Sequence, residues 1–418
     1  MSDQEARQGG TLRAVVAPAA RRGIRRITSY IDTGNEANAA PAEQAAPAGA
    51  SFVWGPAGLD HALALACEDL RAGSLFKARP LLERTRQEWE WAQRGYVSAV
   101  LGALARPTNL AETWVREDKR HPDAWLLWAR TAGVRALRAH DEQAAHDVVD
   151  ELRKIAARAC EGAQSLAPDD PTPQVIMLSL DRLRFREPSP APEELGIDAP
   201  GPWDQFQRVR RLDPHNREAG HHLLAYFQPR HGGAGGGHRI AEWIATYLAP
   251  VDSPLRLLPL YAELELGPDP ERQGGVAPAR ERRVALLEDL LEEVSERQGV
   301  YASYDQQRRT ERIEQLHAAL EEAKDEHATA YSDWSHETAR ELHHQWFGDG
   351  VRVPYAPVRD LSVLADFLHD AAAREQAADV LRFLSPHASD FPWSRRGAAA
   401  AVLAAVYQDC DVPIPGAG

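Results

Sequence analysis

Apolar side chains recur at helical spacing along most of the chain from about residue 57 onward. One such face consists of Leu152, Ile155, Ala159, Ala163 and Leu166. A second consists of Trp125, Trp128, Ala129, Ala132 and Ala136, and a third of Ile313, Leu316, Leu320, Ala323, Tyr331 and Trp334. Spacings of three, four and seven residues place side chains on one face of an α-helix. Because no sustained two-residue alternation of β-branched residues occurs, the pattern predicts an all-α fold.

An internal repeat organises the first half of the chain. Three prolines recur at intervals of 46 residues, namely Pro122, Pro168 and Pro214. Eight positions before each proline stands a large apolar side chain, namely Trp114, Cys160 and Phe206. A proline ends one helix, and an Asp or Asn beside it can cap the next. One such helix pair cannot bury its own apolar faces, so we expect the pairs to stack into a solenoid of antiparallel helical hairpins.

The segments HPDAWLLWA and LDPHNREA resemble the start of a repeat in the tetratricopeptide-like superfamily. The resemblance covers roughly residues 58–250, with a further pair at 358–385, and implies packing roles for Trp125, Ala129, Ala219 and Leu223. The period of 46 residues departs from the usual 34. The segment FQPRHGG…AEW is also similar to an uncharacterised bacterial helical-repeat family. These resemblances imply a right-handed helical stack.

The chain divides into five regions by pattern. Residues 1–54 are rich in alanine, proline and small polar residues, and contain a basic cluster at 21–27, so we expect a disordered segment. Residues 55–275 carry the repeats. Residues 276–350 contain long, densely charged helices that suit a hairpin packed on the array, or a contact with a second chain. Residues 351–410 read as a last helical pair, over 358–372 and 374–385, with a cap. Residues 411–418 read as an exposed tail.

Composition narrows the classes of partner. The net charge of −14 argues against general nucleic-acid binding and against adsorption to anionic membranes. No apolar run is long enough to span a bilayer, and the N-terminus lacks the apolar core of a secretory signal. The cysteines Cys67, Cys160 and Cys410 stand far apart, which fits a reducing cytoplasm. We expect Cys67 and Cys160 in the core, and Cys410 near an exposed end.

Five histidines and a glycine-rich stretch fall between residues 211 and 248. The stretch lacks the Lys and Ser or Thr of a phosphate loop, and no strand precedes it, so we expect a flexible turn from Gln228 to Gly237 between two helices. The buried faces of these helices would hold Ala219, Leu223, Tyr226 and Phe227, then Ile240, Ile244, Tyr247 and Leu248. Weak candidates for metal ligands are His215, His222, His231 and His238. Since no known ligand spacing occurs, we expect structural histidines, no metal and no cofactor.

No catalytic motif is present in the sequence, which favours a binding protein over an enzyme. Trp89 and Trp91 cannot both face inward if they stand two apart on one helix, so one of them could line a groove. We assign Trp89, Trp91 and Arg230 to a partner-binding surface. The expected function is a scaffold that holds a peptide or helix of a basic or amphipathic protein. The alternatives are an enzyme with a histidine-based metal site near 215–238, and a self-assembling structural component.

Overall fold

The computed structural model describes residues 50–183, 188–192, 199–227, 234–250, 253–265, 335–348 and 355–416. Within these ranges the regular structure is almost entirely helical, and the sheet has two strands of two residues each. The predicted all-α class is therefore confirmed. A membrane-crossing helix, long and apolar enough for a bilayer, does not occur in this part of the chain. Residues 1–49 and 266–334 lie outside the described residues, and with them most of the predicted charged helices.

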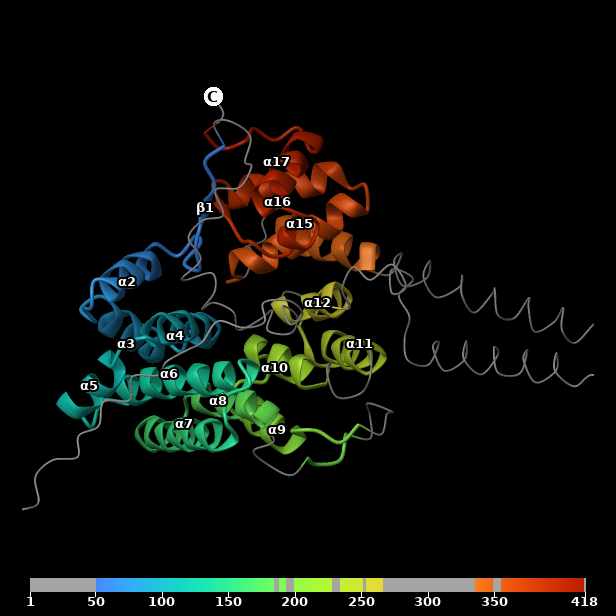
Figure 1. Cartoon of the computed structure of the whole chain (residues 1–418). Coiled ribbons are helices and arrows are strands. Elements are labelled where there is room, and N and C mark those ends of the chain that lie inside the picture. The colour runs from blue at the N-terminus through green and yellow to red at the C-terminus, as the bar shows by residue number, and fades with distance from the viewer. Residues whose placement is uncertain are drawn as a thin grey trace, which may run out of the picture.

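The helices up to residue 265 form two alternating sets. The first set comprises α2 (His61–Arg71), α4 (Trp91–Ala105), α6 (Pro122–Asp141), α8 (Thr172–Leu180), α10 (Arg217–Phe227) and α12 (Leu258–Glu265). The second comprises α3 (Ala78–Gln87), α5 (Leu110–Glu117), α7 (His146–Leu166), α9 (Trp203–Leu212) and α11 (Ala234–Trp243). Each helix of the first set packs on the next member of that set, and Figure 1 shows this succession from α2 to α12.

The C-terminal helices continue from α12. They are α15 (Val358–Asp370), α16 (Arg374–Leu384) and α17 (Ala399–Asp409), with the 3₁₀ turn η5 (Trp393–Arg395) before α17. A helical segment at 335–347 precedes α15. Two further 3₁₀ turns lie earlier in the chain, η1 (Asp181–Leu183) directly after α8 and η4 (Pro254–Leu257) directly before α12. α15 packs on α12 and on α16. The predicted pair at 358–372 and 374–385 is thus present. One apolar core extends from α8 to α17, and a separate one joins α2 to α6.

Three helices of the second set end in the same way. The last residues of α5, α7 and α9 are followed by Asp118, Ala167 and Asp213, whose φ and ψ angles are −140° and 91°, −138° and 79°, and −142° and 96°. Each donates its backbone N–H to the carbonyl four residues earlier. The geometric repeat therefore joins positions 118, 167 and 213, not the three prolines at equal intervals.

The predicted equivalence of the three prolines is wrong for Pro122. Pro168 and Pro214 each follow such a cap directly, whereas Pro122 opens α6. The caps at Asp118 and Ala167 are 49 residues apart, and those at Ala167 and Asp213 are 46 residues apart. Three residues make nearly one helical turn, so the shift leaves the apolar register almost unchanged. For this reason the register residues are still buried: Trp114, Cys160 and Phe206.

The predicted buried face of α11 is wrong at one position. Ile240 and Ile244 are buried, but Tyr247 is 74% exposed. The helix widens into a π-helical turn, η3 (Ile244–Leu248), in which the Ala249 N–H bonds to the Ile244 carbonyl. A π-turn adds a residue to the turn and so rotates the following side chains away from the 3.6-residue register.

Both boundaries of the folded region differ from expectation. Residues 50–54 are placed with the C-terminal helices, because β1 (Val53–Trp54) pairs in parallel with β2 (His387–Ala388). At the other end, Val412 is buried, and the N–H of Ser51 donates to the Pro415 carbonyl at 2.7 Å. Apolar side chains in both segments pack on the core of α15 to α17. The amino-acid composition of these segments does not predict that packing.

Candidate functional site

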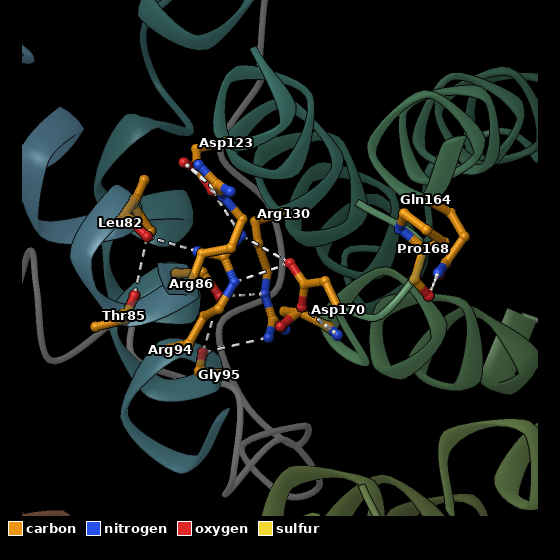
Figure 2. A network of polar contacts seen from close by, with 12 residues as sticks. Leu82, Thr85, Arg86, Arg94, Gly95, Asp123, Arg130, Gln164, Pro168 and Asp170 are labelled. Carbon is orange, nitrogen blue, oxygen red and sulfur yellow. Dashed lines mark hydrogen bonds and ion pairs between the residues drawn. The ribbon is translucent and has the colours of Figure 1, made fainter. Parts of the chain in front are cut away.

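A cluster of buried charges lies between α3, α4, α6 and the start of α8 (Figure 2). Its centre is Arg94 of α4, which is fully buried. This guanidinium donates to Asp123 at 2.6 Å, to Asp170 at 2.8 Å and to the Leu82 carbonyl at 2.7 Å. Arg86 bonds to the same Asp123 carboxylate. Burial disfavours the charged form, but Asp170 and Asp123 outweigh it and raise the pKa of Arg94.

A second cluster joins α4, α6 and α10. Arg130 forms a two-pronged ion pair with Glu218 and donates to the Ser98 hydroxyl at 3.0 Å and the Gly95 carbonyl at 3.2 Å. The Nε2 atom of His222 lies 3.1 Å from Glu218. Burial alone would raise the pKa of Glu218, yet Arg130 and His222 lower it to about 2. Burial lowers the pKa of His222 in spite of Glu218, which favours the neutral imidazole.

A third cluster joins α10 to α12 and α15. Arg217 pairs with Asp360, its Nε donating at 2.5 Å, and the Tyr261 hydroxyl donates to the same carboxylate at 2.6 Å. The ring of His221 meets that of Tyr261 edge-on, with centroids 4.6 Å apart. Burial, followed by the charge of Arg217, lowers the pKa of His221, so this ring too is neutral. Burial and Asp360 raise the pKa of Tyr261.

The three clusters form one continuous row of charges that runs from α3 and α4 to α15. Arg130 contacts Gly95, the neighbour of Arg94, and Glu218 follows Arg217 in sequence. A cavity that touches the row has a volume of about 10 Å³, enough for one water at most. A catalytic acid or base must reach a substrate. The row is therefore suited to holding the helices in register, since a misplaced helix would leave buried charges unpaired.

Aromatic side chains gather where α4, α10 and the approach to α15 meet. The small cavity is lined by Trp91 and Tyr96 of α4, by Asn216 and Arg217, and by Tyr355. The rings of Tyr96 and Tyr355 meet edge-on, with centroids 6.3 Å apart. These residues form the inner end of a surface that continues outward to the turn before α4.

The turn before α4 presents the most exposed tryptophan of the described residues. In this aromatic turn (residues 88–91), Trp89 is 61% exposed, and its ring lies 5.4 Å from that of Trp91. Trp89 has a φ of 57°, and the Glu90 N–H bonds to the Thr85 carbonyl, which is a Schellman ending for α3. The placement of both tryptophans on one helix is thus wrong. Their proximity comes from the turn, which projects Trp89 into solvent beside the exposed Glu88 and Glu90.

The histidines predicted as weak metal candidates have separate environments. His215 is exposed, with Nδ1 2.9 Å from the Leu248 carbonyl oxygen. His222 bonds to Glu218, and His238 is buried in α11. His231 lies outside the described residues, as does Arg230 of the predicted partner surface. Among the residues that the structure describes, no three or more His, Cys, Asp or Glu side chains group in a way that could hold a metal ion.

Two further expectations concern glycines and cysteines. Gly235, Gly236 and Gly237 belong to the first turn of α11, so the predicted loop from Gln228 to Gly237 ends earlier than expected. Cys67 and Cys160 are buried, as predicted. Cys410 is also buried, contrary to the expectation of an exposed end, and burial raises the pKa of its thiol. The raised pKa makes this thiol less reactive as a nucleophile.

The sequence interpretation missed the residues of the charged row. A signal was present, because Arg94 stands three and seven residues before the apolar Val97 and Leu101. That spacing places an arginine on the buried face of its helix. A charge at such a position is rarely buried unless it is paired. The identity of the partners could not follow, since they come from helices far away in the sequence.

Comparison with protein-family models, with curated proteins and with solved structures finds no match to this chain.

Proposed function

We propose that the chain is a non-enzymatic protein-binding scaffold, in which helix pairs stack as a tetratricopeptide-like solenoid. The observation that carries this proposal is the shared ending of α5, α7 and α9, with similar cap angles at Asp118, Ala167 and Asp213. Similar caps turn the chain in a similar way after each of these helices. Together with the successive packing of α2, α4, α6, α8 and α10, they support a stack of equivalent units.

The aromatic turn is the part of this scaffold best suited to meet a partner. Trp89 offers a large exposed ring backed by Trp91, and aromatic anchors of this kind contribute strongly to protein interfaces. Glu88 and Glu90 flank it with negative charge, and the whole chain carries −14. A basic, amphipathic helix or peptide offers matching chemistry, with apolar side chains for the rings and cations for the carboxylates.

Selection from a displayed peptide library tests this proposal. Peptides enriched on the full-length chain should be rich in Lys and Arg, with apolar positions at helical spacing. Their affinity should fall at least about tenfold for the W89A/W91A variant, because the aromatic anchors supply much of the binding free energy. The matched control is Tyr247→Ala, which removes another exposed aromatic side chain, 74% exposed on η3. Equal loss in both variants, or no enrichment of cationic peptides, would contradict the proposal.

A further inference from the structure

A short extended segment ties the start of the described chain to its C-terminal helices. This N-terminal strap (residues 51–58) precedes α2, whose core is shared with α4 and α6. Ala57 of the strap packs on that core, whereas Phe52 and Trp54 pack on the core of α15 to α17. Figure 1 shows β1 beside α15 and α16, whereas α2 lies beside α4. The strap therefore bridges two separate apolar cores.

The strap is held in the manner of a bound peptide. The Ser51 N–H donates to Pro415, and the Val53 N–H donates to Pro386 at 2.9 Å. Phe52 and Trp54 pack against the C-terminal core, with the Phe52 ring 5.4 Å from that of Tyr407. Val53, between them, is 47% exposed. Main-chain hydrogen bonds along one edge and alternate side chains turned inward are the features of recognition by β-strand addition.

The hold of the C-terminal helices on residues 51–54 is limited to few contacts. β1 has two residues, and both Phe52 and Trp54 keep part of their surface exposed. Beyond them the chain turns at Gly58, which has a φ of 50° and would place a Cβ atom 2.3 Å from Val358. Only glycine fits both that conformation and that close approach. The remainder of the strap is held on the other side, where the Tyr96 hydroxyl donates to the Pro56 carbonyl at 2.5 Å and Ala57 packs on the core of α2 to α6.

We propose that the surface formed by β2, Tyr407 and Pro415 is a docking site for an extended segment with two aromatic residues that flank one outward-facing residue. Residues 51–54 occupy the site in cis, and a partner segment of the same chemistry exchanges with them. The site lies at the C-terminal helices and does not involve the aromatic turn, so this inference stands independently of the proposed scaffold function.

The test uses the full-length chain with the strap released and a labelled peptide added in trans. The F52A/W54A variant empties the site, and the probe is a fluorescent peptide with the sequence of residues 50–58. We expect saturable binding to this variant at least about tenfold tighter than to the unaltered chain, where the strap competes. The same peptide with both aromatic residues changed to Ala should bind neither protein. Val53→Ala is the matched control and should behave like the unaltered chain.

A second variant guards against misfolding of the first. Val53→Pro keeps both aromatic side chains but removes the N–H that bonds to Pro386. It should also bind the peptide more tightly than the unaltered chain, by a smaller factor. Absence of saturable binding to both variants would overturn the proposal, as would equal binding to the unaltered, V53A and F52A/W54A chains.

Discussion

Buried carboxylates occur in both halves of the molecule, but their surroundings have opposite consequences. Among the helices from α2 to α10, Glu218 faces Arg130 and His222, which overcome the effect of burial and lower its pKa to about 2. In the C-terminal part, from α12 to α17, burial raises the pKa of Glu263 in α12 to about 7 and that of Asp366 in α15 to about 7. Asp366 does contact Arg396, at 2.7 Å, but burial and the nearby Asp370 outweigh that contact. A close arginine alone does not keep a buried carboxylate ionised.

The two halves should therefore respond differently to pH. A lowered pKa in the folded state contributes stability above the unfolded value, and that contribution disappears as the pH falls through about 2. A raised pKa gives stability that is complete below the unfolded value, near 4 for a carboxylate, and is lost as the pH rises through about 7. The ion-paired helices α2 to α10 should resist acid, while α12 and the C-terminal helices should weaken toward alkaline pH.

The largest expected effect comes from removing Arg94 from the row of buried charges. Arg94→Met leaves Asp123 and Asp170 buried without their guanidinium, which should lower the free energy of unfolding by about 3–5 kcal/mol. Chemical denaturation at pH 7 would measure this change. Arg84→Met is the matched control, since Arg84 pairs with Glu88 on an exposed surface and should cost about 0.5 kcal/mol or less. Equal losses in the two variants would remove the special role of burial.

Opposite signs are expected for two matched glutamate variants. Glu263→Gln removes a carboxylate that is costly to ionise, so the free energy of unfolding at pH 8 should rise by about 2 kcal/mol, with little change at pH 4. Glu218→Gln removes the partner of Arg130 and should destabilise the chain at pH 7. Thermal unfolding across the pH range would show both. If both variants moved stability in one direction, the contrast between the two halves would fail.

The smallest effect concerns the joint between the halves. Tyr261→Phe removes the hydroxyl that donates to Asp360, while Arg217 continues to pair with that carboxylate. The free energy of unfolding should fall by about 1 kcal/mol, the usual contribution of one hydrogen bond. Tyr247→Phe, at an exposed tyrosine, serves as the control and should leave stability unchanged. A loss as large as that of R94M would mean that Tyr261 is essential to the third cluster.

Much of the helical architecture could be predicted from local pattern, because buried faces depend on residue spacing. The pair at α15 and α16 and the buried side chains of α10 follow directly from it. Tyr247 could not, since a π-turn changes the spacing without a signal in the residue types. The sequence pattern places Trp89 wrongly, because α3 ends at Gln87 and Trp89, two residues later, has a positive φ angle. The pairing of Arg217 with Asp360 joins residues 143 positions apart, which local pattern does not specify.

The hydrogen bond between Ser51 and Pro415 brings the first and last parts of the described chain to one point on the surface. A chain that starts at residue 51 could be rejoined there by a short linker and opened at another surface turn, as in a circular permutant, with the described helices kept in place. Two probes attached near these positions would stay close while the strap is docked and separate when it leaves. The distance between residues 51 and 415 would thus report directly on whether the strap is docked or released.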